Sequence, residues 1–348
     1  MKPGAFHATG EPERLTFGTA LERQPSLAER PDGGLLVAFS SASSNDDIWS
    51  VPLDASLGKP LGPAQRLTDN AARDQMPWIS ADGKILVFAS NRTGGLEIWR
   101  KDLDTGKEKA LTSAPPAQFF PNLTADGAKV AYSASPTLSP GVLSVSPASG
   151  GVSQRLCDAC GRPNQWSADH AKLLHNIQPN AALRARIDLL DVTSGRSVTL
   201  LEHSSYPLHT ARLSPDERWL CFHAGTGVVN RRIYVAPFRG PQQIQEKDWI
   251  PATDGSALDR EPCWSPDGNL IYFLSDRDGF RCVWAQRLLP ATKQPVGGPS
   301  PVYHSHAARR SLIQVGDTGR TGLFVVPGRM IFTLNELTGN IWVMQLQK

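Results

Sequence analysis

Residues 264–284 read WSPDGNLIYFLSDRDGFRCVW, in which an apolar run lies between two tight-turn signals. The first turn is Pro266-Asp267-Gly268, the apolar run is Leu270 to Phe273, and a second glycine turn leads to the pair Val283-Trp284. Asp suits the first turn because its side chain bonds its own downstream backbone, and Gly suits it because it accepts a positive φ. The stretch therefore predicts a strand, a tight turn and further strands in quick succession.

The same unit recurs along the chain. Aligned on the turn aspartate, six units follow one another at steps of 50, 44, 43, 47 and 51 residues, at Asp32, Asp82, Asp126, Asp169, Asp216 and Asp267. A seventh, degenerate unit is placed at residues 323–332, where Val326-Pro327-Gly328 replaces the turn. Each unit predicts four short strands rich in β-branched and aromatic residues. No long run has helical spacing, so few helices are expected.

Repeats of this period are typical of propellers and solenoids. Sheets stacked radially around an axis bury both of their faces and leave only short edges. We therefore predict an all-β, seven-bladed β-propeller of four-stranded antiparallel blades, as a single domain over residues 1–348. Residues 13–16 read as a fourth strand without its first three, and residues 339–344 as a third strand with nothing after it. We expect this N-terminal strand to pair with the C-terminal blade and close the ring.

Bulk properties exclude several classes of protein. The formal net charge of +3 is spread over 348 residues with acids and bases interleaved, so no basic stripe for nucleic acid is present. No run approaches the 18 or so continuous apolar residues of a membrane span, and the first residues are polar, without the core of a signal peptide. We expect a monomer without a membrane span, cytoplasmic if the chain is complete and periplasmic if it is a fragment of an exported protein.

The five cysteines fall into two groups. Cys221, Cys263 and Cys282 lie in apolar strand patterns and read as buried small hydrophobes. Cys157 and Cys160 form a single C-x-x-C, which can be a local disulfide, a pair of free thiols or half of a metal site. Metal is the weakest of these interpretations, because structural zinc takes four ligands and no second pair exists.

The repeat resembles the PD40 or TolB-like branch of the WD40-related β-propellers. The best match is Trp264 to Phe273 with Ser275 to Gly279, followed by Trp78 to Phe88 with Ser90 to Gly95. The resemblance covers essentially the whole chain, without the α/β domain that precedes the propeller in TolB. It implies a docking module, a periplasmic scaffold, the sensor half of a signalling protein or the companion domain of a peptidase. It assigns the repeated Asp and Gly to the fold.

Ligands of such propellers usually sit on the face where the first strands begin and the second glycine turns emerge. The sequence places a ring of polar side chains seven positions before the turn aspartates, at residues next to these positions, and in the glycine turns. In the first unit, which is two residues longer, the corresponding position is nine residues before the aspartate. The predicted ligand-binding residues are Arg23, Gln75, Arg92, Arg162, His209, Asp259, Arg260 and Arg277. Several guanidiniums in such a ring suit a carboxylate or a phosphate, because Arg offers paired donors. The alternative is that these side chains are solvated or form salt bridges within the fold.

A second cluster is His304-Ser305-His306. On a strand, residues two apart share a face, so both imidazoles can meet one Zn²⁺ or Mn²⁺ ion, with a third ligand from His209 or from an aspartate of the polar ring. Trp78, Trp166 and Trp264 are assigned to one repeat position and to packing between blades.

No catalytic residue is predicted, because the chain has no G-x-S-x-G, H-E-x-x-H or phosphate-binding motif. The leading hypothesis is a non-enzymatic module without a cofactor that recognises a protein partner or a small anionic ligand, as in the sensor half of a bacterial signalling assembly. The alternatives are a metal-assisted lyase or hydrolase with its site at the channel mouth, and a detached propeller of a kinase, regulator or peptidase.

Overall fold

The computed structural model describes residues 15–16, 21–113, 115–135, 141–158, 160–177, 185–225, 231–306, 310–312 and 322–346. The chain divides into two compact units. The smaller consists of Met1–Ser44 and Leu337–Lys348, and the larger of Asn45–Glu336. The assignment of residues 1–348 to a single domain stays a prediction.

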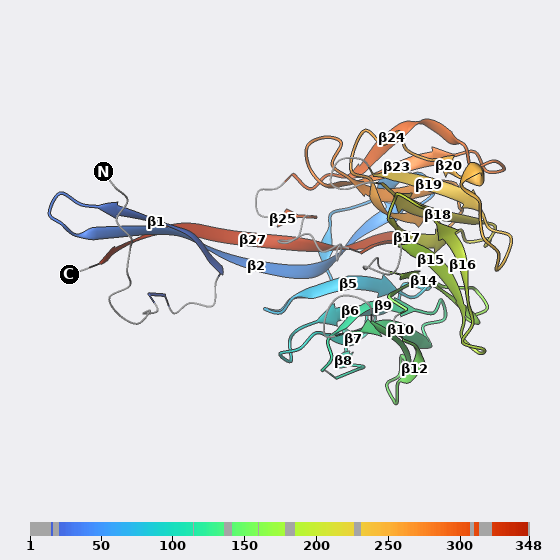
Figure 1. The fold of residues 1–348 in the computed structure, drawn as a ribbon, viewed down its shortest axis with the longest axis horizontal. Coiled ribbons are helices and arrows are strands. Elements are labelled where there is room, and N and C mark those ends of the chain that lie inside the picture. The colour runs from blue at the N-terminus through green and yellow to red at the C-terminus, as the bar shows by residue number, and fades with distance from the viewer. Residues whose placement is uncertain are drawn as a thin grey trace. The chain divides into compact units, whose positions relative to one another are not determined.

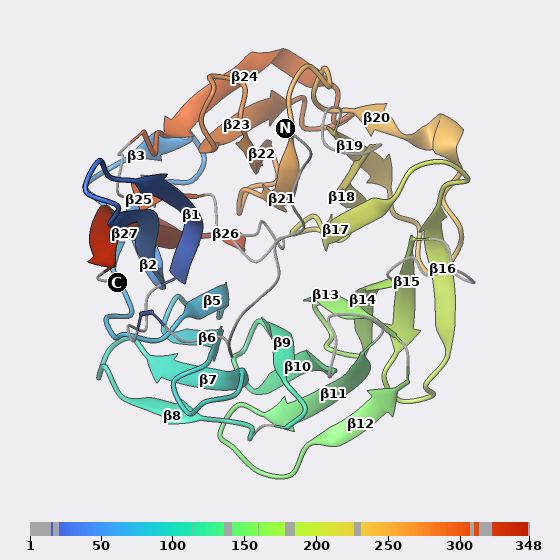
Figure 2. The same cartoon turned by 60° about the vertical axis from the view of Figure 1, so that its left-hand side comes forward.

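The larger unit contains five four-stranded antiparallel sheets, each built from consecutive strands. They follow one another around a ring, with the first strand of each nearest the centre (Figure 2). In chain order their strands are β5 (Asp74–Ile79), β6 (Ile85–Ser90), β7 (Glu97–Asp102) and β8 (Glu108–Ala110); β9 (Gln118–Leu123), β10 (Lys129–Ala134), β11 (Val142–Pro147) and β12 (Gln154–Cys157); β13 (Arg162–Trp166), β14 (Lys172–Ile177), β15 (Arg186–Asp191) and β16 (Ser197–Glu202); β17 (Leu208–Leu213), β18 (Trp219–Ala224), β19 (Arg232–Pro237) and β20 (Ile250–Pro251); and β21 (Arg260–Trp264), β22 (Leu270–Ser275), β23 (Cys282–Leu288) and β24 (Pro295–Tyr303). These sheets are the blades of a β-propeller, so the prediction of an all-β propeller is confirmed.

The aspartate turn joins the first two strands of every blade. A Ser or Thr hydroxyl two residues before the aspartate donates to its carboxylate. The carboxylate also accepts the backbone N–H two residues further on, at 3.0–3.2 Å. The residue after the aspartate has a positive φ, and it is Gly83, Gly127 or Gly268 in three blades but His170 or Glu217 in the other two. The aspartate turn thus keeps its shape where glycine has been replaced.

Neighbouring blades are held together by apolar clusters and by two tryptophans. Apolar side chains on facing sheets form continuous buried clusters. Trp166 of β13 donates its indole N–H to the carbonyl of Asn122 in the preceding blade, at 3.0 Å. Trp264 of β21 does the same to Arg212 in β17, at 3.1 Å. These two tryptophans therefore have the inter-blade role that the sequence predicted.

The predicted number of seven blades is wrong. The first and last of the seven sequence units form no blades of their own, because their strands join one seven-stranded sheet. Its order is β1-β2-β27-β25, with β26 beside β27 and both β3 and β4 beside β2. These strands are β1 (Leu21–Glu29), β2 (Leu35–Asp54), β3 (Lys59–Pro60), β4 (Gln65–Arg66), β25 (Arg310–Ser311), β26 (Leu323–Val326) and β27 (Arg329–Leu346).

The length of β2 gives the physical reason for this error. In each of the five blades the segment between the second and third strands contains a glycine or a proline, whereas residues 40–46 read SSASSND. Without either residue to interrupt it, the chain continues as a single strand of 20 residues. The first unit consequently has one long strand where two were predicted.

The closing strand predicted at residues 13–16 is also wrong for the two residues that the structure describes, Leu15 and Thr16. Glu13 and Arg14 lie outside the described residues, and Leu15 and Thr16 are not in a strand. The strands that pair with β27 are β2, β25 and β26. Within the larger unit, the Asn335 side-chain amide donates to the Asp46 carboxylate at 2.7 Å, which links these two strands.

In the smaller unit, β1 and the first part of β2 form an antiparallel hairpin (Figure 1). Leu21 lies opposite Ala42, and Glu29 lies opposite Leu35. Asp32 accepts the Gly34 backbone N–H at 3.1 Å in the turn, so the first repeat signal does mark a hairpin.

The described residues contain no α-helix, and their one helical segment is the 3-10 turn Glu246–Asp248. None of the described segments is therefore a helix of the length and apolar character needed to cross a bilayer.

Candidate functional site

A bulge in the first strand of each blade shapes the centre of the ring. Six residues before the turn aspartate, four blades have a non-glycine residue with a φ of 51–55°, and the ladder register shifts there. These residues are Met76, Phe120, Thr210 and Glu261. The remaining blade has Pro163 at this offset, with a register shift beside it. Because a bulge changes the direction of a side chain, it can turn such residues toward the channel.

All five bulge residues line a cavity of about 60 Å³, here called the mouth cavity. Its other lining residues include Trp78, Arg162, Asn164, Asn176, His209, Arg212 and Phe324. A second cavity of about 410 Å³, here called the turn-side cavity, is lined by residues nearer the aspartate turns, such as Ala81, Ala125, Ala168 and Pro266. Trp78, Arg212 and Phe324 line both cavities, so they lie between them.

Arg212, which lines both cavities, packs against two aromatic rings. Its guanidinium carbon lies 4.4 Å from the centre of the Trp78 ring and 4.0 Å from that of Phe324. One Nη donates to the Asn164 carbonyl at 3.1 Å, while the buried Nε has no hydrogen-bond partner among the described residues. Arg212 also forms no ion pair with a described carboxylate. A cation enclosed by aromatic rings is thus left without an opposite charge in direct contact.

The mouth cavity has more positive than negative charge. Glu261 is the one carboxylate among its described lining residues, whereas Arg162 and Arg212 are both cationic. Burial raises the pKa of Glu261, while the nearby charges of Arg212, Arg162 and Arg260 act in the opposite direction. The cavity therefore favours an anionic occupant over a cationic one.

His209 adds a neutral polar group to this wall. Burial lowers its pKa to about 4, and repulsion from Arg231 and Arg162 acts in the same direction. Its ring lies 5.2 Å from that of His223, whose pKa burial lowers as well. Near pH 7 both imidazoles are therefore neutral and can donate or accept a hydrogen bond.

Two of the predicted ligand-binding residues, Arg162 and His209, line the mouth cavity. Gln75 and Arg260 occupy the same offset in their strands and are buried, but they do not line it. Arg23 lies in β1, in the smaller unit.

The other three predicted residues form ion pairs inside blades. Arg277 contacts Asp259 at 2.9 and 3.1 Å, donates to Ser275 and stacks on Trp284. Arg92 has the matching place in the first blade, 2.9 Å from the buried Asp74 carboxylate. The carboxylates of Asp259 and Asp74 are buried, so these pairs hold the glycine turn to the start of the first strand. A role of Arg92, Asp259 and Arg277 in ligand binding stays a prediction.

Sequence reasoning missed Arg212, Trp78 and Phe324. Trp166 and Trp264 precede the turn aspartate by three residues, but Trp78 precedes it by four, as Arg212 does. The assignment of all three tryptophans to one repeat position was therefore inaccurate. That difference of one residue was the available signal, because successive residues of a strand point to opposite faces.

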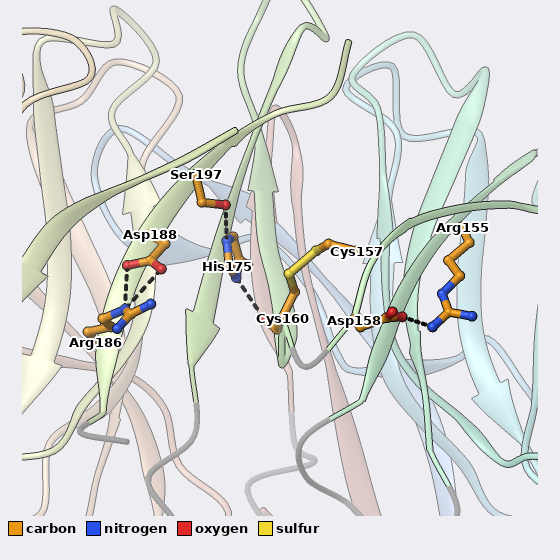
Figure 3. The surroundings of a disulfide bond; sticks show 8 residues. All are labelled: Arg155, Cys157, Asp158, Cys160, His175, Arg186, Asp188 and Ser197. Carbon is orange, nitrogen blue, oxygen red and sulfur yellow. Dashed lines mark hydrogen bonds and ion pairs between the residues drawn. A yellow bond between two sulfur atoms is a disulfide. The ribbon is translucent and has the colours of Figure 1, made fainter. Parts of the chain in front are cut away.

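The C-x-x-C pair forms a disulfide between Cys157 and Cys160 (Figure 3). His175 lies beside it, with Nδ1 2.6 Å from the Cys160 carbonyl and Nε2 3.3 Å from the Ser197 hydroxyl. Burial lowers the pKa of this imidazole, partly offset by Asp188. The sulfurs are bonded to each other, which leaves this pair without thiolates for a metal.

The predicted metal ligands His304 and His306 lie together just after β24. His304 Nδ1 and His306 Nε2 are 3.3 Å apart, and both face Asp278 in the loop between β22 and β23. His209, which the sequence suggested as a third ligand, instead lines the mouth cavity.

No family model matches the chain. An uncharacterized protein of Agrobacterium fabrum is 30% identical over 102 residues, which are 29% of this chain and 33% of that protein. The chain thus matches about a third of the length of that relative.

Solved structures give a broader match. A putative TolB from Agrobacterium tumefaciens has a TM-score of 0.59 at 19% identity, over 75% of this chain and 89% of that one. TolB from Acinetobacter baumannii has a TM-score of 0.56 at 13% identity, over 79% of each chain. An oligogalacturonate lyase in complex with manganese has a TM-score of 0.53 at 14% identity, over 92% of this chain and 99% of that one. At these identities the likeness establishes the fold alone: the chain has a β-propeller fold like that of the TolB structures, as the resemblance in the sequence predicted.

Proposed function

We propose that this protein is a recognition module whose mouth cavity receives the carboxylate of a protein segment. The observation that carries the proposal is Arg212, a buried guanidinium with no carboxylate partner among the described residues. A ligand carboxylate in the mouth cavity would place an opposite charge in direct contact with this guanidinium through a charge-assisted hydrogen bond.

The size of the cavity indicates which ligands suit it. A volume of about 60 Å³ has room for only about four or five water-sized groups. That is enough for an acidic side chain or a chain terminus, but far less than the several hundred Å³ typical of sites that enclose a drug-sized molecule. A peptide that inserts one carboxylate and rests the remainder on the surrounding face fits this volume better than an oligosaccharide does.

A peptide display experiment tests the proposal. A random peptide library with free C-termini is selected on the full chain, and the best binder is then synthesised with a carboxylate and with an amide end. We expect the amide, or a peptide whose acidic side chains are neutralised, to bind at least about tenfold more weakly, because a charge-assisted hydrogen bond is lost.

The matched variants are Arg212→Met and Arg239→Met. Arg239 is exposed and lies outside both cavities, so its loss should leave peptide affinity unchanged, whereas Arg212→Met should reduce it at least about tenfold. Equal affinity of the two variants, or a selection that yields no binder, would contradict the proposal.

The metal-assisted lyase or hydrolase has less support. His304 and His306 line neither the mouth cavity nor the turn-side cavity, so a metal held there would not face a ligand in either one. A place in a signalling assembly and a monomeric state stay predictions.

A further inference from the structure

Four potential metal ligands converge at the edge of the fifth blade. Asp278 lies in the loop between β22 and β23, Cys282 is the first residue of β23, and His304 and His306 follow the end of β24. One donor atom from each lies within 4.8 Å of all the others. Two loops and one strand therefore bring a carboxylate, a thiol and two imidazoles to one point.

The distances match those around a tetrahedral ion. Asp278 Oδ2 lies 3.1 Å from His304 Nδ1 and 3.0 Å from His306 Nε2, and the two nitrogens are 3.3 Å apart. Zinc bonds of about 2.0–2.1 Å to nitrogen and oxygen place the ligand atoms of a tetrahedron about 3.3 Å from one another. Three of the four atoms thus already have the separation that a shared zinc ion requires.

Surrounding groups hold these side chains in place. The Phe280 ring stacks on His306 with centroids 4.4 Å apart, and Trp284 meets His304 edge to face at 6.0 Å. The Ser305 backbone N–H points at the Cys282 sulfur from 3.4 Å, and the Phe280 backbone N–H donates to the other Asp278 oxygen at 3.3 Å. Contacts of this kind orient metal ligands and support a thiolate.

We propose that Asp278, Cys282, His304 and His306 form a zinc site that fastens the β22–β23 loop to the end of β24. A thiolate with two imidazoles favours zinc over magnesium or calcium, which prefer oxygen ligands. Four protein ligands fill a tetrahedral ion and leave no open position for a substrate, as in structural sites. Since none of the four residues lines either cavity, the site is independent of peptide recognition.

Metal titration of the full chain, purified without a histidine tag and stripped with EDTA, tests this site. We expect one equivalent of Zn²⁺ to bind with a Kd below about 1 µM, as measured by competition with a chromophoric chelator. With Co²⁺ as the probe, the wild-type protein should show a thiolate-to-cobalt charge-transfer band. Cys282→Ser should lack this band, because its hydroxyl cannot replace the thiolate.

His306→Ala is the decisive variant, because its side chain is 43% exposed and its loss should not prevent folding. It should weaken Zn²⁺ binding at least about 100-fold, since one of four ligands is removed. Cys221→Ala and His170→Ala, which alter residues away from the cluster, should bind as the wild type does. Less than one equivalent at micromolar free Zn²⁺, or equal affinity of His306→Ala and the wild type, would overturn the inference.

Discussion

Arg277 and Arg212 both contact aromatic rings, but Arg277 forms an ion pair with a carboxylate and Arg212 forms none with a described one. Arg277 stacks on Trp284 and contacts the buried Asp259 carboxylate at 2.9 Å, as Arg92 does with Asp74. Arg212 lies between two aromatic rings, without such a contact among the described residues. An arginine whose charge is neutralised inside the blade stabilises the fold, whereas one whose charge is not can attract an anion from outside.

The largest expected effect is on stability, from substituting Arg277, the arginine that is paired with a buried carboxylate. Arg277→Met leaves the Asp259 carboxylate buried without its cation, so we expect the free energy of unfolding at pH 7 to fall by about 3 kcal/mol. Burial already raises the pKa of Asp259, and the substitution raises it further. The loss should therefore shrink as the pH falls and this carboxyl becomes protonated, which urea denaturation at several pH values measures.

Arg212→Met is the matched control for this experiment. The same substitution removes a buried charge that has no ion partner, so stability should change by less than about 1 kcal/mol or even increase. An equal loss of stability in both variants would show that the distinction between the two arginines is wrong.

An intermediate effect is expected from acid, because His209 can add a further cation to the cavity wall. Its folded pKa of about 4 lies below the ordinary value of 6.5, so the unfolded chain binds the proton first as the pH falls. Stability from this group is thus complete above pH 6.5 and is lost toward pH 4, by about 2 kcal/mol at pH 5. Between pH 7 and pH 5 the free energy of unfolding of His209→Gln should therefore fall by about 2 kcal/mol less than that of the wild type. If the two proteins lose stability in parallel over this range, His209 is not the origin of the acid sensitivity.

The smallest expected effect concerns two tryptophans, one whose indole N–H donates a hydrogen bond to a described residue and one whose indole N–H does not. Trp166→Phe removes the hydrogen bond to the buried Asn122 carbonyl. We expect it to lower the free energy of unfolding by about 1 kcal/mol more than the same substitution at a tryptophan without such a bond. Trp249→Phe is the match, because its indole N–H has no hydrogen-bond partner in the described part of the chain. Thermal unfolding of the two variants makes the comparison, and an equal decrease would remove the inter-blade hydrogen bond from the explanation.

The repeat was predictable from the sequence because its signals are local. A hydroxyl, an aspartate and a residue with positive φ define each turn within four residues, and five consecutive units folded as their spacing indicated. The ends of the chain were not predictable in the same way. The sheet that includes both β2 and β27 depends on contacts such as that of Asp46 with Asn335, which are 289 residues apart.

The candidate sites were predictable only in part, for a similar reason. The offset from the turn aspartate found Arg162 and His209, but a bulge decides which further side chains line the channel, and no simple motif encodes it. The spacing of His304 and His306 suggested a metal, but Asp278 lies 26 residues earlier than His304 and joins the pair only through the fold of the blade.

The sheet shared by the two ends of the chain has a consequence for synthesis. The five blades use consecutive strands, so each can form soon after it leaves the ribosome. The strand pairing between residues 45–54 and 329–336 must wait until almost the whole polypeptide has been made. A nascent or prematurely terminated chain will therefore expose the unpaired edge of β2 for most of its translation, and this edge is where chaperones or misassembly would act first.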